Sequence, residues 1–377
     1  MAISFYINIL LRILNKIYNN LNNRGLISSP PKPAGFVTIN LESSIIPKKV
    51  IYSHLIPNKI STFNKNKVIS IPTPLDSAKL TLPEIGTYKF QYWLKGYDIN
   101  NLHVLDSNYL NWYKVRKALL DFEANKVSQQ LPESFNSCRE ALFQVVGYLE
   151  FKYPDAYISI YINNELHIVN KINGEVYSLN SQRPLDVLAL LTMDDFSILQ
   201  IRPDGEYYLT ASATLFPIGW ALNERIGYSI RDLHNSAPKW RKGDYAYDNT
   251  RGLFDKIKGP HVFHRNNYFI VNTSKLFLPE NIIKIPLAGD IGNLPGFRYE
   301  DIYVRRELQT AIRLIESNSI LFTVRTFIAP MTSLTDTQLL NLHELYLSIK
   351  KENREYHNVH KLEPVIRKYI TEVRKLK

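Results

Sequence analysis

The sequence predicts an α+β fold, in which helices precede, interrupt and follow an antiparallel sheet. Three observations support this prediction. Two segments in the first half of the chain have apolar residues at helical spacing. Short segments of alternating polarity follow them and are joined by turn residues. The 24 Tyr and 17 Phe residues also favour sheet structure with aromatic packing.

Composition limits the class of protein. Of the 377 residues 45% are hydrophobic and 21% are charged, which suits a packed core. The net charge of +11 favours anionic partners, but no zinc, RRM-like or helix-turn-helix pattern accompanies it, so nucleic acid is not an expected partner. Cys138 is the only cysteine, which excludes disulfides within the chain, CxxC metal sites and cysteine-bound iron–sulfur clusters.

The N-terminal segment 1–24 is basic, and its apolar residues lie between Phe5 and Tyr18. Arg12 interrupts this apolar part, which is shorter than the roughly 20 residues that span a bilayer. Three interpretations remain: an apolar helix that anchors the chain to a membrane through residues 1–20, a mitochondrial-type presequence, and an ordinary docked helix. The first two predict a membrane-associated or a mitochondrial protein.

Residues 25–84 follow as a linker and an extended arm, irregular and rich in Pro, Ser, Asn and Lys. The main domain is expected over residues 85–355. Its first elements are helices over Asn108–Val127 and Ser137–Phe151, the second of which Tyr153-Pro154 ends.

Turn residues then mark the strands. Asn163-Asn164 and Pro203-Asp204-Gly205 each predict a hairpin. The expected strands are Tyr157–Ile162, Glu165–Val169, Glu175–Leu179, Phe196–Arg202, Glu206–Thr214, His261–Val271 and Ser319–Ile328, with helices over Pro184–Met193, Tyr303–Ile315 and Thr335–Lys377. The last helical region includes a basic tail, 356–377, which either covers the domain or offers a charged face to a partner.

The stretch Tyr207–Trp240 is predicted to form one wall of a pocket. A strand is followed by a turn at Pro217–Trp220, a short helix over Ala221–Ile226 and then a single histidine, His234. Such a histidine is either structural or a ligand of haem iron, which needs a neutral imidazole whose second nitrogen is held by an acceptor.

Further polar groups lie on the neighbouring elements. Arg265, Asn267 and Tyr268 lie on one predicted strand, where they have either structural roles or roles in the pocket. Glu307 lies on the predicted 303–315 helix, either on a solvent-exposed face or beside the pocket. Arg325 lies inside the apolar strand LFTVRTF, where it needs a carboxylate partner. Glu307 and a ligand's acid, such as a haem propionate, are the two candidates. The chain has no GxGxxG, GxxxxGK[ST], HExxH or GxSxG motif.

Several segments resemble, in order, the haem-dependent oxidative N-demethylase alpha subunits. The likeness spans roughly residues 85–355. It is carried by PLDVLALLTMDDFSIL at 184–199, LFPIGW at 215–220, ERIG at 224–227, LHNSAP at 233–238, FDK at 254–256, RNNY at 265–268, RRELQT at 305–310 and LFTVRTF at 321–327.

The resemblance implies a haem-binding PAS-like fold and an enzyme that demethylates a small amine with dioxygen as co-substrate. Electrons would arrive from an external reductase, because no reductase region is encoded here. It also implies His234 as the axial iron ligand, with the cofactor- and substrate-side candidates Arg265, Arg325, Glu307, Asn267 and Tyr268.

The chain departs from the family pattern at several positions. Leu308 replaces an arginine, Met193-Asp194 replaces Gln-Glu, and Asn235–Ala237 replaces Ala-Pro-Val. Two alternatives therefore stay open: a non-catalytic haem-binding or sensory PAS-like module attached to a membrane, and a basic interaction protein whose tail binds anionic surfaces.

Overall fold

The computed structural model of the chain describes residues 95–234, 245–258, 261–279, 298–351, 354 and 358–376. All of them belong to one unit, Asn58–Lys377. The predicted apolar helix at 1–24 and the arm at 25–84 lie outside the described residues. Among the residues that are described, no helix has the length and apolarity needed to cross a membrane.

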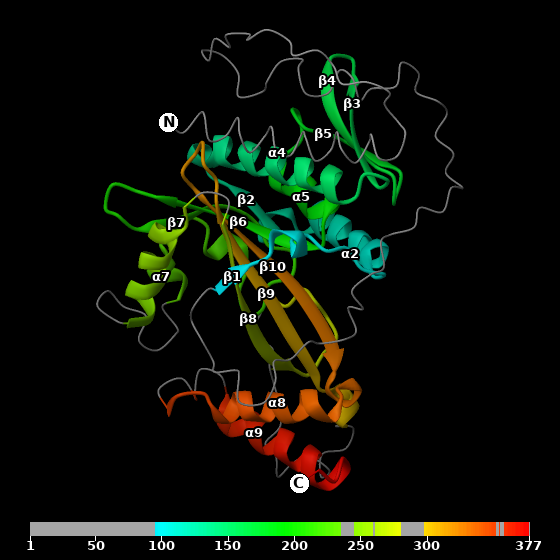
Figure 1. Ribbon diagram of the computed structural model, residues 1–377, viewed down its shortest axis with the longest axis vertical. Helices are drawn as coiled ribbons and strands as arrows, with labels where there is room; N and C mark the ends of the chain where they lie inside the picture. The colour runs from blue at the N-terminus through cyan, green and yellow to red at the C-terminus, as the bar shows by residue number, and fades with distance from the viewer. Residues whose placement is uncertain are drawn as a thin grey trace, which may run out of the picture. The chain divides into compact units, whose positions relative to one another are not determined.

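A seven-stranded antiparallel sheet organises the fold, as Figure 1 shows. In order across the sheet, its strands are β1 (Lys95–Tyr97), β8 (Val262–Val271), β9 (Tyr303–Arg313), β10 (Ile320–Pro330), β6 (Asp194–Ile201), β7 (Tyr207–Ala213) and β2 (Ser128–Gln130). A second sheet contains β3 (Tyr157–Ile162), β4 (Glu165–Asn170) and β5 (Glu175–Ser178). The predicted α+β class is confirmed.

In the described part of the chain, helices occur between and after the strands. The α-helices are α2 (Tyr109–Phe122), α3 (Ala124–Val127), α4 (Phe135–Lys152), α5 (Pro184–Leu191), α6 (Ile230–Leu233), α7 (Tyr245–Lys256), α8 (Asp336–Leu347) and α9 (Val359–Lys368). Short 3-10 turns span Ile99–Asn101, Pro132–Ser134, Leu222–Glu224, Tyr299–Asp301 and Met331–Ser333, and a π-helical turn spans Tyr369–Val373. The helix expected over Ala221–Ile226 is thus a single 3-10 turn.

Local turn chemistry explains why the β3–β4 hairpin was predictable. Asn163 and Asn164 both have positive φ, 50° and 64°, as a two-residue type I′ turn requires. In the β6–β7 hairpin Gly205 has φ 79°, a value that glycine adopts without strain. The predicted turn after β7 has Gly219 at φ 73°.

The predicted helix over Tyr303–Ile315 is wrong, because this segment is strand β9. Its polar residues Arg305, Glu307 and Gln309 recur at every second position, which is the strand period. They suggested a solvated helix face, yet all three are buried. A polar strand can lie inside the sheet here because these side chains bond to one another.

In helix α2 the buried positions do not follow the apolar residues of the sequence. Val115 and Phe122 are apolar but 43% and 84% exposed. Arg116 takes the core position instead and is completely buried. The helix therefore turns a charged residue towards the interior, where it requires an acidic partner.

Strand register separates the residues of β8, β9 and β10 into two faces. Glu307 lies opposite Asn267 on β8 and opposite Thr326 on β10, so these three share one face, here called the Glu307 face. Arg325 lies opposite Leu308 and belongs to the other face, here called the Arg325 face.

The C-terminal helices cover one end of the Arg325 face (Figure 1). Helices α8 and α9 share a buried apolar cluster with residues of β8 and β10, among them Tyr268 and Phe327. The basic tail region therefore contributes to the core of the same unit.

Candidate functional site

A chain of hydrogen-bonded polar side chains crosses the Glu307 face. Nε of Arg265 donates to Oε1 of Gln309 at 2.6 Å, and Nε2 of Gln309 donates to Oε2 of Glu307 at 3.2 Å. Nε of Arg305 lies 3.2 Å from Oε1 of Glu307. Strands β8 and β9 thus present two arginines and one carboxylate in a fixed row, with Asn267 directly opposite Glu307.

Arg305 joins this row to two loops. Its guanidinium is completely buried and donates to the backbone oxygens of Phe216 and, at 2.9 Å, of Leu276. The backbone N–H of Phe216 donates to Asp195 at 3.0 Å, and Asp195 also pairs with the buried Arg116 at 2.7 Å. The segment that carries the FPIGW motif is therefore held to the sheet by buried charges.

His234 follows helix α6, whose N-cap Ser229 accepts a hydrogen bond from the backbone N–H of Asp232. Nδ1 of His234 lies 2.8 Å from the carbonyl oxygen of Ile230. Because a carbonyl only accepts, Nδ1 carries the hydrogen and Nε2 carries the lone pair.

The surroundings also keep this imidazole neutral. Burial lowers the pKa of His234 to about 4, and although the bond to Ile230 opposes the shift, the charges of Arg265 and Arg225 add to it. Ile230 of α6 shares a buried apolar cluster with Ala311 of β9, so the helix that precedes His234 packs on the side of the sheet that carries the Glu307 row. A neutral imidazole anchored through Nδ1 is the form in which histidine binds a metal through Nε2.

Arg325 and Tyr268 lie on the opposite face. Arg325 is buried and pairs with Asp106, while its NH1 group donates to the backbone oxygen of Met193 at 3.1 Å. Glu307, one of the two partners considered for Arg325, does not pair with it, because Arg325 lies opposite Leu308 and adjacent positions on β9 point to opposite faces. Burial raises the pKa of Tyr268 to about 12, although the charge of Arg306 opposes this.

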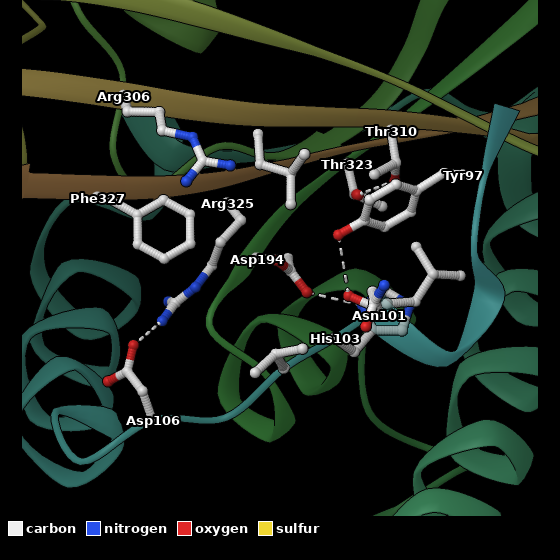
Figure 2. Close-up of a pocket in the computed structure, with 13 residues that line it drawn as sticks. Tyr97, Asn101, His103, Asp106, Asp194, Arg306, Thr310, Thr323, Arg325 and Phe327 are labelled. Carbon is white, nitrogen blue, oxygen red and sulfur yellow. Dashed lines mark hydrogen bonds and ion pairs between the residues drawn. The ribbon is translucent and has the colours of Figure 1, made fainter. Parts of the chain in front are cut away.

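A cavity opens on the Arg325 face, and Figure 2 shows the residues that line it. Its volume is about 220 Å³. Arg306, Thr310, Thr323 and Arg325 line it from the sheet, and His103 lines it from the segment that precedes α2. It contains none of the residues of the Glu307 row. Of the six predicted site residues, five are thus divided between the two faces of the sheet, and the sixth, His234, follows helix α6.

One family model matches this chain over residues 93–367, and its description is haem-dependent oxidative N-demethylase, alpha subunit-like. The chain belongs to this family. The match includes the whole seven-stranded sheet and both of its faces, so the predicted family is confirmed. As a member of the N-demethylase alpha subunit-like family, the chain is expected to depend on haem.

The residues near His234 suit the haem that the N-demethylase alpha subunit-like family implies. The imidazole has the required tautomer, and Arg265 would supply a positive charge for a propionate. Apolar side chains of Trp220, Ile230 and Leu233 form part of the surrounding cluster. The cavity on the Arg325 face is smaller than the roughly 300–1,000 Å³ of pockets for drug-sized ligands, and it does not suit haem.

The sequence analysis did not identify three charged residues that form buried ion pairs around the sheet: Asp106, Arg116 and Asp195. One signal could have found Arg116, because it lies four residues after Trp112 and four before Leu120, inside the apolar stripe of α2. The acids gave no such signal, since their partners are distant in the sequence. The described residues contain no group of three or more His, Cys, Asp or Glu side chains that could hold a metal ion.

Proposed function

We propose that this chain binds haem through His234 and removes a methyl group from a small amine in an oxygen-dependent reaction. The observation that carries the proposal is the half-buried, neutral imidazole whose Nδ1 is fixed by Ile230, together with membership of the N-demethylase alpha subunit-like family. The antiparallel sheet would serve as a PAS-like support for the cofactor. A separate reductase would supply the electrons.

The bound haem would supply the activation of dioxygen. In the proposed reaction a secondary N-methylamine, dioxygen, two electrons and two protons give the primary amine, formaldehyde and water. One oxygen atom enters formaldehyde and the other enters water. The protein must therefore hold an amine and deliver protons at one position.

Glu307 is the residue proposed to meet the amine. Its carboxylate is buried, and Arg305 and Gln309 each bond to one of its oxygens. A carboxylate held in this way has lone pairs left for the N–H of an alkylammonium and can accept a proton. Asn267, directly opposite on β8, would add an amide to the same position. Arg265 would pair with a propionate.

Two of the residues that differ from the family pattern lie outside the row that contains Glu307. Leu308 lines the cavity on the Arg325 face, and so does Asp194. The side chains proposed to act on the substrate lie on the Glu307 face. This separation favours a catalytic role over a purely sensory one.

The test of haem binding is the absorption spectrum of the purified full chain, oxidised and reduced, with and without carbon monoxide. We expect a Soret band that His234→Ala abolishes or shifts and that added imidazole restores. His167→Ala is a matched control, because Nδ1 of His167 also lies within bonding distance of a backbone oxygen, that of Glu165 at 2.9 Å. A chain without a Soret band after haem reconstitution would refute the proposal, and an unchanged spectrum in His234→Ala would refute the ligand.

Turnover is tested separately with small secondary N-methylamines and an electron donor. We expect one formaldehyde per dioxygen consumed in the wild type, and loss of formaldehyde in Glu307→Gln with the Soret band retained. If the haem-loaded wild type forms no formaldehyde from these amines, the sensory alternative takes its place.

A further inference from the structure

The side chain of Arg225 spans the segment that leads from β7 to His234. Its NH1 group donates to the backbone oxygen of Leu233 at 3.0 Å, eight positions later in the chain. Leu233 is the last residue of α6, and His234 follows it directly. Arg225 therefore holds the peptide group that connects His234 to the helix.

Helix α6 depends on such a contact because it has only four residues, Ile230–Leu233. The last carbonyl groups of a helix have no partner within it, and an arginine side chain can bond to one of them. The N–H of His234 donates to the carbonyl oxygen of Arg231 at 3.2 Å. With the bond from Arg225, both polar atoms of the Leu233–His234 peptide group are hydrogen-bonded.

Arg225 is itself held in place. Its guanidinium carbon lies 5.3 Å from the ring centroid of Trp220, within the distance of about 6 Å at which a cation is attracted to an aromatic face. Its backbone N–H donates to the carbonyl oxygen of Leu222 at 2.9 Å, and its own carbonyl accepts from the N–H of Tyr228 at 3.0 Å. These contacts fix both the backbone and the guanidinium of Arg225.

Strand β7 holds the other end of α6. The N–H of Gly227 donates to the carbonyl oxygen of Leu209 at 2.8 Å, and Gly227 has a φ of 83°, which glycine adopts without strain. Ser229, the N-cap of α6, forms an isolated bridge with Tyr208. The sheet thus holds the start of the helix, and Arg225 holds its end.

The position of this turn also determines which nitrogen of His234 carries the hydrogen. Nδ1 of His234 bonds to the carbonyl oxygen of Ile230, four positions earlier, so the bond needs helical spacing between the two residues. If the turn opens, the neutral imidazole can carry its hydrogen on Nε2, and the lone pair then lies on Nδ1. Closing the turn therefore keeps the lone pair on Nε2.

We propose that Arg225 is a positioning residue for His234, which closes the last turn of α6 and so keeps Nε2 of the imidazole available to haem iron. This inference rests on the proposed role of His234 as the iron ligand. It also gives a physical reason why three segments of the family likeness occur together. Trp220 of LFPIGW, Arg225 of ERIG and Leu233 of LHNSAP are in direct contact.

The first test uses the haem-free full chain with isotope-labelled histidines and reads the ring nitrogens of His234 by NMR, with His234→Ala to identify its signals. We expect only the Nδ1-protonated form in the wild type and in Arg225→Lys, which keeps a cationic donor. Arg225→Met should give a mixture with the Nε2-protonated form. An unchanged tautomer in Arg225→Met would overturn the proposal.

Arg231→Met is the matched control for this test. Arg231 lies on α6 itself, and its side chain is half exposed and 3.6 Å from Asp232. Its replacement removes the same charge close to His234 but leaves the bond to Leu233 in place. We expect the wild-type tautomer, and an equal change in Arg231→Met and Arg225→Met would overturn a specific role of Arg225.

The second test follows the loss of haem from the loaded full chain to an excess of a haem-free globin. Removing an outer partner of a metal-bound histidine typically weakens metal binding by about 10–100-fold. We therefore expect Arg225→Met to lose haem at least about tenfold faster than the wild type, and Arg225→Lys and Arg231→Met to stay close to it. Equal rates in Arg225→Met and the wild type would overturn the proposal.

A double variant separates positioning from direct contact with haem or from general support of the fold. In His234→Ala supplemented with imidazole, Arg225→Met should cause no further acceleration of haem loss. An acceleration that persists without His234 would overturn the positioning role. A wild type without a Soret band would overturn the proposed function and the link to haem, whereas the tautomer in the haem-free chain separately supports or overturns the positioning of His234 by Arg225.

Discussion

Replacing Arg305 with methionine tests whether buried charges hold the Glu307 face together. Arg305 is completely buried and bonds to Glu307, to Thr326 at 3.3 Å and to the backbone oxygens of Phe216 and Leu276. Methionine fills a similar volume but donates no hydrogen bond. The substitution therefore leaves one carboxylate and two carbonyl groups without these donors.

The expected cost follows from these contacts. Removing one partner of a buried ion pair costs about 3–5 kcal/mol, because the remaining charge is left without compensation. That is a large part of the roughly 5–15 kcal/mol by which a typical domain is stable. Arg202→Met should cost at most about 1 kcal/mol, because the Arg202–Glu133 pair is largely exposed.

Urea unfolding followed by circular dichroism and tryptophan fluorescence measures these differences. The double variant Arg305→Met with Glu307→Leu should recover part of the loss, since it removes the unpaired carboxylate. A loss below about 1 kcal/mol in Arg305→Met would refute the reasoning. So would a double variant in which the two losses simply add.

Two further predictions concern individual titrating groups. In the haem-free chain, the unfolded state should protonate His234 near pH 6.5, whereas the folded state does so only near a pKa of about 4. The contribution of His234 to the free energy of unfolding therefore falls as pH decreases between these values. His234→Gln should remove this part of the pH dependence in urea titrations at pH 5 and pH 7, and an unchanged slope would contradict it. Burial raises the pKa of Cys138 to about 12, although the hydrogen bond to Ser134 opposes this shift. The thiol should therefore not react with a thiol reagent at pH 8 until urea unfolds the protein. Rapid labelling of the folded protein would contradict this prediction.

The sequence predicted those elements whose cause is local. Asn163-Asn164 determines a hairpin through its own φ values, and Tyr153-Pro154 marks the end of α4 at Lys152. In each case a few neighbouring residues are sufficient to decide the structure.

The remaining features depend on partners that lie far apart in the chain. Arg325 was expected to need a carboxylate, and it has one, but Asp106 is 219 residues away and carries no local sign of this role. The strand β9 looked helical because its charges suggested solvent. Only the contacts between Arg305, Glu307 and Gln309 show that a charged strand is stable in the interior.

Alternation along β9 divides the side chains of the family motif RRELQT between the two faces of the sheet. Arg305, Glu307 and Gln309 belong to the Glu307 face, whereas Arg306 and Leu308 belong to the Arg325 face and its cavity. A shift of one residue in register would exchange the two sets, so both faces depend on the same strand alignment. The buried guanidinium of Arg305 connects β9 to two loops and opposes such a shift. The replacement of the family's arginine by Leu308 therefore changes the lining of the cavity on the Arg325 face and leaves the row that contains Glu307 intact.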